Sequence, residues 1–260
     1  MSTKKKMSRN PAGRIIKEDI LRGFYHNRYR ILLVVLVITG VVVLMTGRRH
    51  SMTDIILFLQ GGCEYSDMLR NGRIEFPYIW LFMQFMPAFL VFNYCNDDCE
   101  GVGVDVLIKC QSRELWWFSK CIWNVCTVIA FYIITYFITF IKALGNGKTD
   151  IKVNVVIIYL MAVPVLVSIA AGLFQMAVSS AFNPVIGLLA VMLLMASSVF
   201  FNTPFLIGNV SMVMRSSVYS AQGIAVWKGI SVCVLMYVIS FAAGMIVFKK
   251  KDILHRESGD

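Results

Sequence analysis

The chain has 260 residues, of which 58% are hydrophobic and 15% charged, and its formal net charge is +10. A soluble domain of this size carries about 25% charged residues, so the composition excludes an ordinary soluble domain. The apolar residues form long runs separated by short polar stretches, which is typical of a helical protein that crosses a membrane several times. Many Lys and Arg stand near the chain ends, which favours an anionic membrane surface over a nucleic acid as their partner.

Residues 8–30 read SRNPAGRIIKEDILRGFYHNRYR and predict a helix before the first apolar run. Asn10 can cap this helix, and Pro11 suits its first turn. An apolar stripe at helical spacing, beside a basic face, predicts an amphipathic elbow helix in the membrane interface. The stripe consists of Ile16, Ile20 and Phe24. A basic flank without a fixed helix is the alternative.

Six apolar runs predict six transmembrane helices, because a helix of about 20 residues crosses a hydrocarbon core of about 30 Å. The expected spans are residues 31–46, 77–95, 117–141, 153–178, 184–205 and 229–248. An even number of spans puts both termini on one side, and the distribution of Lys and Arg favours the cytoplasmic side. The sequence thus predicts an all-α integral membrane protein. Its parts are a cytoplasmic region with the elbow helix at 1–30, a six-helix domain at 31–248 and a basic cytoplasmic tail at 249–260.

Two loops on the expected outer face carry further patterns. The long first loop, residues 47–76, contains an apolar piece at 55–59 that predicts a small external helix. Between the third and fourth spans, GNGKT at 145–149 is similar to the end of a phosphate-binding loop. That loop needs a glycine five positions before Gly147, where this chain has Lys142, and no strand precedes it. A tight Gly-Asn-Gly turn is the better interpretation.

The inner parts of the six apolar runs contain no Asp, Glu, Arg or His. Lys120 stands at the cytoplasmic end of the third run, where its side chain is expected to snorkel to the interface. Neutral polar residues such as Gln84 are expected to form hydrogen bonds between helices. An intramembrane protease and a proton-coupled transporter are therefore excluded, whereas a sodium site made of backbone carbonyls stays open. We expect a non-catalytic subunit with no catalytic residue.

The loop between the second and third spans, residues 93–120, is acidic at its start and contains glycines. A docking segment for a cytoplasmic partner is the preferred interpretation, and a solvated acidic loop is the alternative. A zinc site could be drawn from Cys95, Cys99 and Cys110, but their spacing fits no common ligand set, so no metal site is predicted. The seven cysteines are expected to be reduced thiols.

Together these elements resemble the ABC-2 type family of exporter permeases. The resemblance rests on the elbow helix, the six spans, DDCEGVGVDVL at 97–107, the pair Ser112-Arg113, Lys120, and the ending IVFKKKDIL at 246–254. It implies the permease subunit of an ATP-binding-cassette exporter, in the plasma membrane of a prokaryote. ATP and Mg²⁺ would be bound by two separate cytoplasmic ATPase subunits, and this chain would hold no cofactor. A second permease, identical or homologous, would complete the transporter, in contact with membrane lipid.

The resemblance also implies roles for particular residues. The residues expected to dock the ATPases are Ile16, Ile20, Phe24, Asp97, Asp98, Glu100, Gly101 and Arg113. The residues expected to line the path of a peptide or a hydrophobic or amphipathic compound are Gln84, Met86, Phe89, Met192, Met195 and Phe200. Short re-entrant helices are expected within 202–218. A second interpretation is a non-transporting immunity or assembly protein that binds a partner within the bilayer.

Overall fold

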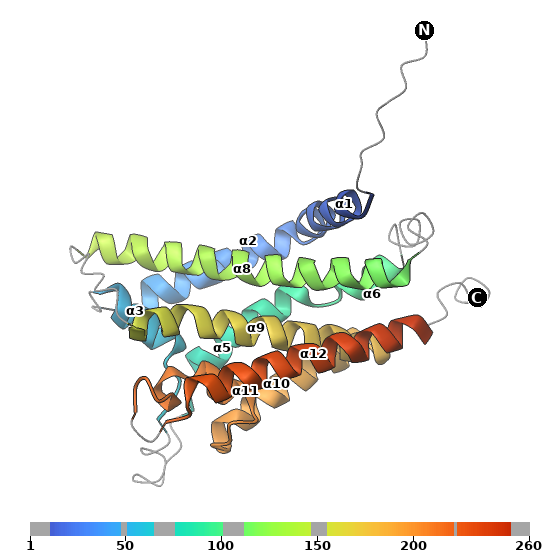
Figure 1. Cartoon of the computed structure of the whole chain (residues 1–260). Coiled ribbons are helices and arrows are strands. Elements are labelled where there is room, and N and C mark those ends of the chain that lie inside the picture. The colour runs from blue at the N-terminus through green and yellow to red at the C-terminus, as the bar shows by residue number, and fades with distance from the viewer. Residues whose placement is uncertain are drawn as a thin grey trace.

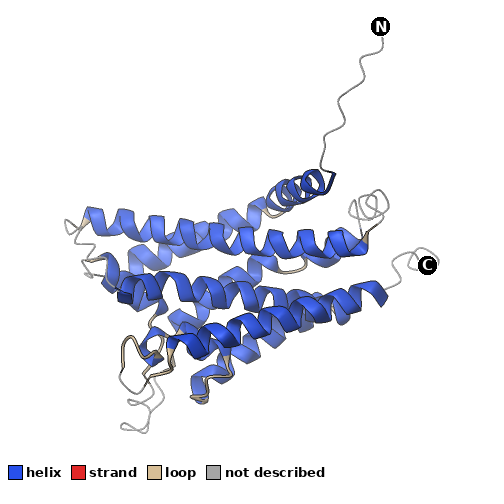
Figure 2. Cartoon of the chain, in the orientation of Figure 1, coloured by secondary structure: helices blue, strands red, loops and turns tan. Residues whose placement is uncertain are grey.

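The computed structural model describes residues 11–47, 51–64, 76–100, 112–146, 155–220 and 223–250. Helices joined by short loops make up this part of the chain (Figure 2). Within these ranges the β-structure is limited to an isolated bridge between Ser216 and Ile224. The prediction of an all-α fold is confirmed for the described residues.

The first two helices form an elbow. Helix α1 spans Pro11–His26 and helix α2 spans Arg28–Gly40, with the π-helical turn η1 at Val41–Met45 directly after α2. Asn27 separates α1 from α2 and is buried. Helix α1 begins at Pro11. Proline suits this position because the N–H groups of a first helical turn have no partner within the helix, so its missing N–H costs no hydrogen bond. Helix α1 packs against helix α8, so the predicted helix exists and has a fixed partner.

Helix α3, Met52–Gln60, corresponds to the small helix expected in the first loop. Its N-terminus is capped by Ser51, whose Oγ accepts a hydrogen bond from the Asp54 N–H at 3.1 Å. The helix is not peripheral, because Ile55, Leu59 and neighbouring side chains are buried against α5, α8 and α9. The apolar piece that marked this helix in the sequence is therefore part of the core of the bundle.

The second predicted span is broken near its end. Helix α5 spans Tyr78–Val91, and the short helix α6 spans Tyr94–Glu100. Between them Asn93 has φ of +65°, a left-handed conformation that asparagine tolerates better than most residues. The acidic run of the loop thus lies on a separate helix instead of in an extended loop.

Four longer helices complete the bundle. They are α8 at Arg113–Gly145, α9 at Val155–Ala181, α10 at Pro184–Phe200 and α12 at Val226–Lys250. Ser112 caps α8 by accepting from the Leu115 N–H, and Asn183 caps α10 in the same way. Helix α9 packs against α5, α8, α10 and α12 and lies at the centre of the bundle. Between α10 and α12, the short helices α11 (Ile207–Ser211) and η2 (Val213–Arg215) confirm that the 202–218 stretch forms short helices.

The helices are arranged so that two ends of the bundle differ (Figure 1). Helix α1, helix α6, the start of α8 and the end of α12 lie at one end, which we call the elbow end. Helix α3 and helix α11 lie at the opposite end, which we call the loop end. The first described helix and the end of the last one therefore lie at the same end of the bundle.

Five helical stretches in the described part are long and apolar enough to cross a membrane. They are residues 28–45, 78–97, 113–145, 157–181 and 226–250. Helix α10, at 17 residues, is apolar but shorter than the rest. The chain is thus a helical membrane protein with several spans, while the sixth span and the side on which the termini lie stay predictions.

Candidate functional site

A buried ion pair joins α1 to α8 at the elbow end. Lys120 Nζ lies 2.5 Å from Asp19 Oδ1, and the two side chains are 0% and 3% exposed. Neither charge reaches water, so each stabilises the other in a medium where an isolated ion is costly. This pair is the strongest electrostatic contact between the elbow helix and the bundle that the described residues show.

Two hydroxyl groups and Arg22, whose Nη2 donates to Asp19 Oδ1 at 3.4 Å, complete the coordination of the Asp19 carboxylate. Ser119, the neighbour of Lys120, donates to Asp19 Oδ2 at 2.9 Å. Tyr94, the first residue of α6, places its hydroxyl 3.0 Å from both Asp19 Oδ1 and the Asp19 main-chain oxygen. The four residues Asp19, Tyr94, Ser119 and Lys120 thus connect α1, α6 and α8, and we call them the charged joint. Bonds to a carboxylate are about twice as strong as bonds between neutral groups.

Aromatic rings enclose the charged joint. Lys120 Nζ lies 4.4 Å from the ring centroid of Tyr94 and 4.9 Å from that of Trp116. Trp123 stacks on Tyr94 with centroids 4.0 Å apart. These rings attract the ammonium group through their negative faces and exclude water from the ion pair. They therefore make the joint a dry, fixed contact.

Gly23 allows α1 to approach this aromatic wall. A Cβ atom built at Gly23 would overlap the indole ring of Trp123. Asp19, Gly23 and Asn27 recur every four residues and are all buried, so they form the line of α1 that faces the bundle. The predicted stripe of Ile16, Ile20 and Phe24 is only half buried and lies beside this line.

The prediction that Lys120 snorkels to the interface is wrong. Its side chain is fully buried, because Asp19 supplies a counter-charge within reach and the rings close over it. The amphipathic pattern of residues 8–30 did not mark Asp19 as a partner of Lys120. The available signal was the position of Asp19 on the apolar side of the helix, between Ile16 and Ile20.

Part of the predicted docking set lies next to the charged joint. Asp97 of α6 is half buried, accepts a hydrogen bond from Asn93 Nδ2 and lies 3.5 Å from His26 Nε2 at the end of α1. The backbone of α6 continues through Asp98 and Glu100, whose side chains lie outside the described part, as does Gly101. The acidic helix therefore begins beside the elbow.

Arg113, the last predicted docking residue, lies at the start of α8. Its Nη1 donates to the main-chain oxygen of Lys249 at 2.7 Å. Lys249 in turn lies 2.5 Å from Glu114 through its Nζ. The first turn of α8 is therefore attached to the last turn of α12, on the same end of the bundle as the charged joint.

In the bundle centre, neutral groups form a hydrogen-bonded chain across four helices. The Tyr132 hydroxyl lies 2.9 Å from Ser168 Oγ, and Ser168 Oγ donates to Gln84 Oε1 at 3.2 Å. Gln84 Nε2 then donates to Gln60 Oε1 of α3 at 3.3 Å. We call Gln60, Gln84, Tyr132 and Ser168 the central network. It confirms that Gln84 forms hydrogen bonds between helices, and it shows why α3 is held inside the bundle.

The residues predicted to line a path do not gather on one face of the chain. Gln84, Met86 and Met195 are buried within the chain, and Phe89 and Met192 are half buried. Phe200 is half exposed and its ring centroid lies 6.4 Å from that of Phe76. A path between two chains stays a prediction.

A second buried cation, Arg215 of η2, lies at the loop end. Arg215 is 3% exposed and donates to the main-chain oxygens of Cys63, Ser198 and Val199. It also donates to Asn209 Oδ1 at 2.5 Å. The guanidinium group thereby ties the segment after α3 to the end of α10 and to α11. No pattern in the sequence marked this arginine, because most of its partners are main-chain atoms of distant segments.

No group of His, Cys, Asp and Glu residues that could hold a metal ion is found among the described residues. Cys63, Cys95, Cys121, Cys126 and Cys233 are free thiols there, as expected. Cys110, the last of the three cysteines considered for a zinc site, lies outside the described part. Of GNGKT, the described part includes only Gly145, the last residue of α8, and Asn146.

Comparison with families of known proteins gives one match. Residues 33–254 match the model of a family described as "Protein of unknown function (DUF2705)". Neither the curated proteins nor the solved structures contain a match to the chain. The match covers most of α2 and all the described helices from η1 to α12, so it extends over nearly the whole bundle and not only one motif.

Proposed function

The chain belongs to the DUF2705 family, and we propose that it is the membrane permease of an ATP-binding-cassette exporter. In this proposal the elbow end faces the cytoplasm of a prokaryotic cell. Two separate ATPase subunits bind ATP and Mg²⁺ there, and a second permease, identical or homologous, completes the transporter. The chain itself performs no catalysis and guides a peptide or a hydrophobic or amphipathic compound across the plasma membrane.

The observation that carries the proposal is the charged joint. It binds the acidic helix α6 to α1 through Tyr94 and Asp19, and to α8 through Asp19 and Lys120. A displacement of α6 by a bound partner would therefore move α1 and the start of α8 together. This is the mechanical property that a permease needs in order to receive force from outside the membrane.

The chemistry of the central network also supports the proposal. Its four side chains are neutral and bond to one another, so they offer no titratable carrier at physiological pH for a proton-driven cycle. The energy for transport would therefore enter at the elbow end, where α6 carries Asp97, Asp98 and Glu100. The first of these already lies against His26 of α1.

The test is to co-express the full chain with the ATP-binding-cassette ATPase encoded beside its gene. We expect the two to copurify from membranes, and ATP hydrolysis by the complex to require the chain. Replacing Asp97, Asp98 and Glu100 together by alanine should abolish copurification. The control replaces Asp54, an exposed acidic residue of α3 at the loop end, by alanine and should leave it intact.

Two results would count against the proposal. One is a gene neighbourhood without any such ATPase. The other is a purified chain that moves solute without nucleotide. A folded chain that binds no ATPase but captures a partner within the bilayer would favour the immunity or assembly role instead.

A further inference from the structure

Two prolines lie inside helices of the bundle. Of the six prolines in the chain, Pro87 stands within α5 and Pro164 within α9, and both are buried. The other four lie at helix starts or in a loop. A proline inside a helix has no N–H for the carbonyl four residues earlier, and its ring pushes that carbonyl away, so the helix bends there. Helix α8, by contrast, runs from Arg113 to Gly145 without a proline.

A neighbouring side chain supports the bend in α9. The Tyr136 hydroxyl of α8 donates to the main-chain oxygen of Met161, nearly one turn before Pro164, at 2.9 Å. Helices in membranes tolerate prolines when such groups bind the main-chain atoms that the proline disturbs. The bend at Pro164 is therefore accommodated by its surroundings and does not end the helix.

The parts of α5 and α9 before their prolines are bound to the same short helix at the loop end. Trp80 Nε1 of α5 donates to Ser211 Oγ at 3.1 Å, and the Tyr159 hydroxyl of α9 donates to the Val210 main-chain oxygen at 3.2 Å. Both acceptors belong to α11. Residues 78–86 and 155–163 are thus connected through α11, and we call these two segments the loop half.

The parts after the prolines are bound to each other instead. Gln175 Nε2 of α9 donates to the Ala88 main-chain oxygen of α5 at 3.0 Å, and Asn96 Nδ2 of α6 donates to the Ser179 main-chain oxygen at 3.4 Å. We call residues 88–91 and 165–181 the elbow half. Its contact with Asn96 means that α6, where force enters in the proposed function, is connected directly to this half.

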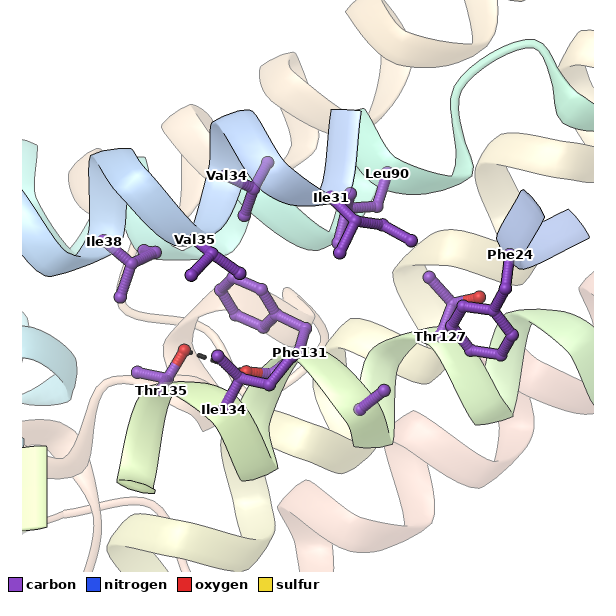
Figure 3. Close-up of a pocket in the computed structure, with 11 residues that line it drawn as sticks. Phe24, Ile31, Val34, Val35, Ile38, Leu90, Thr127, Phe131, Ile134 and Thr135 are labelled. Atoms are coloured by element: carbon purple, nitrogen blue, oxygen red, sulfur yellow. Dashed lines mark hydrogen bonds between the residues drawn. The ribbon is translucent and has the colours of Figure 1, made fainter. Parts of the chain in front are cut away.

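The elbow half is also attached to α2. Leu90 lies beside Ile31 where α2 packs along α8 (Figure 3). Directly after α5, the Phe92 main-chain oxygen accepts from Arg30 Nη1 at 2.6 Å. Helices α2 and α8 therefore lie on the side of the elbow half, whereas α11 lies on the side of the loop half.

One bond of the central network crosses between the two halves. Gln84 stands before Pro87 and so belongs to the loop half, while Ser168 stands after Pro164 and belongs to the elbow half. Ser168 Oγ donates to Gln84 Oε1 at 3.2 Å, and both side chains are buried. We call this contact the hinge bond, because it connects the halves at the level where both helices bend.

We propose that α5 and α9 form a paired hinge. When the hinge bond opens, the helices bend further at Pro87 and Pro164, and the loop half tilts together with α11 against the elbow half and α8. Both helices need a bend for this motion, because each contributes one segment to each half. The inference rests on the proposed function for the force that opens the hinge bond, but not for the hinge itself.

The experiment measures distances between spin labels in the full chain, without an ATPase, in lipid nanodiscs. The labels are carried by an encoded unnatural amino acid, because the chain has native thiols. One pair, at Tyr78 and Leu144, reports the loop half against the end of α8. The other, at Phe118 and Ala181, reports the elbow half against the start of α8, and all four positions are exposed.

Gln84→Leu removes the hinge bond and should add a second distance to the Tyr78–Leu144 pair. Tyr78 lies nine residues before Pro87, so it stands about 13 Å from the bend, and a change of about 20° moves it by about 5 Å. Adding Pro87→Ala and Pro164→Ala to Gln84→Leu should restore a single distance. The Phe118–Ala181 pair should keep its distance in every variant.

Pro184→Ala serves as the matched control, because this proline lies in the first turn of α10, where its missing N–H costs no hydrogen bond. Added to Gln84→Leu, it should leave the second distance in place. A Gln84→Leu chain with the wild-type distance alone would overturn the proposal. A second distance that survives the replacement of both Pro87 and Pro164 would overturn it as well.

Hydrogen exchange in the wild-type chain covers the case in which these variants do not fold. Residues 165–168 of α9, directly after Pro164, should exchange faster than residues 129–132 of α8, which lie at the level of the hinge bond. Equal protection would contradict the hinge. Neither measurement needs an ATPase, so a hinge in a chain that copurifies with no ATPase would overturn the proposed function alone, and copurification without a hinge would overturn this inference alone.

Discussion

The charged joint and the central network both tie helices together, yet they use different chemistry. The joint links α1, α6 and α8 at the elbow end with a buried carboxylate and a buried ammonium group. The network links α3, α5, α8 and α9 in the bundle centre with amides and hydroxyls only. Charge is thus placed where the helices leave the bundle, and neutral groups where hydrocarbon would surround them.

This difference predicts how much stability each cluster loses when one of its residues is replaced. A charge pair out of water is costly to break, because the remaining partner stays buried without compensation. A neutral hydrogen bond contributes only about 1 kcal/mol net, and its loss can be shared by neighbours. A single substitution in the charged joint should therefore cause a large loss of stability, whereas a single substitution in the central network should cause a small one.

Lys120→Met should have the largest effect on stability. It removes the nearer and fully buried cation from Asp19 and leaves only Arg22, whose Nη2 lies 3.4 Å from Asp19 Oδ1, so the free energy of unfolding in detergent micelles should fall by about 3 kcal/mol. The double variant Asp19→Leu/Lys120→Met removes both charges and should recover most of the loss. A single variant as stable as the wild type would show that Lys120 does not stabilise the buried Asp19 carboxylate. A double variant no more stable than the single one would show the same.

Gln84→Leu should have a smaller effect in the central network. The substitution leaves Gln60 and Ser168 without their shared partner, and we expect a loss of about 2 kcal/mol. Tyr132→Phe, at the end of the same chain, should cost about 1 kcal/mol. The same unfolding measurement checks both, and a loss as large as that of Lys120→Met would erase the contrast between the two regions.

Gly23→Ala should separate packing from helix propensity. The added methyl meets the Trp123 ring, so α1 would be pushed from the joint at a cost of about 1–2 kcal/mol. Gly13→Ala is the matched control on the same helix, where nothing lies within 4 Å of a Cβ. It should stabilise α1 by about 0.5–1 kcal/mol. Gly23→Ala should lower the melting temperature and Gly13→Ala should raise it. Shifts of the same sign would argue against the close approach of α1 to Trp123.

Arg14→Ala should have the smallest effect. Its Nε lies 3.3 Å from Glu18 Oε1, but the two side chains are 71% and 62% exposed. Exposed pairs of this spacing contribute about 0.3–0.5 kcal/mol and are screened by salt. A clear shift in the melting temperature at physiological salt would mean that the outer face of α1 has a partner in the isolated chain.

Local signals predicted much of the fold. Pro11 marked the start of α1 and the apolar piece at 55–59 marked α3, because each of these depends on neighbouring residues. The short helices after α10 were expected from the family resemblance. The break at Asn93 was missed, since the apolar run continues past it and one residue in a left-handed conformation leaves no periodic trace.

The charged joint could not be found in this way. Asp19 and Lys120 are 101 positions apart, and hydrophobic periodicity says which side of a helix is apolar but not which helices meet. Trp123 and Gly23 fit each other only once α1 lies on α8. The predicted docking residues of α1 and α6 belong to segments that meet at the charged joint, and that contact appears only in three dimensions.

The claim that force enters the bundle at the elbow end is tested most directly by a distance measurement on the complex with its ATPase. Spin labels are placed at Lys17 of α1 and Ile186 of α10, which are both exposed. We predict that ATP shifts the distance between the labels, and that the shift is lost when Asp97, Asp98 and Glu100 are alanine. A complex that hydrolyses ATP with no change in this distance, or a shift that survives the alanine substitutions, would contradict the account.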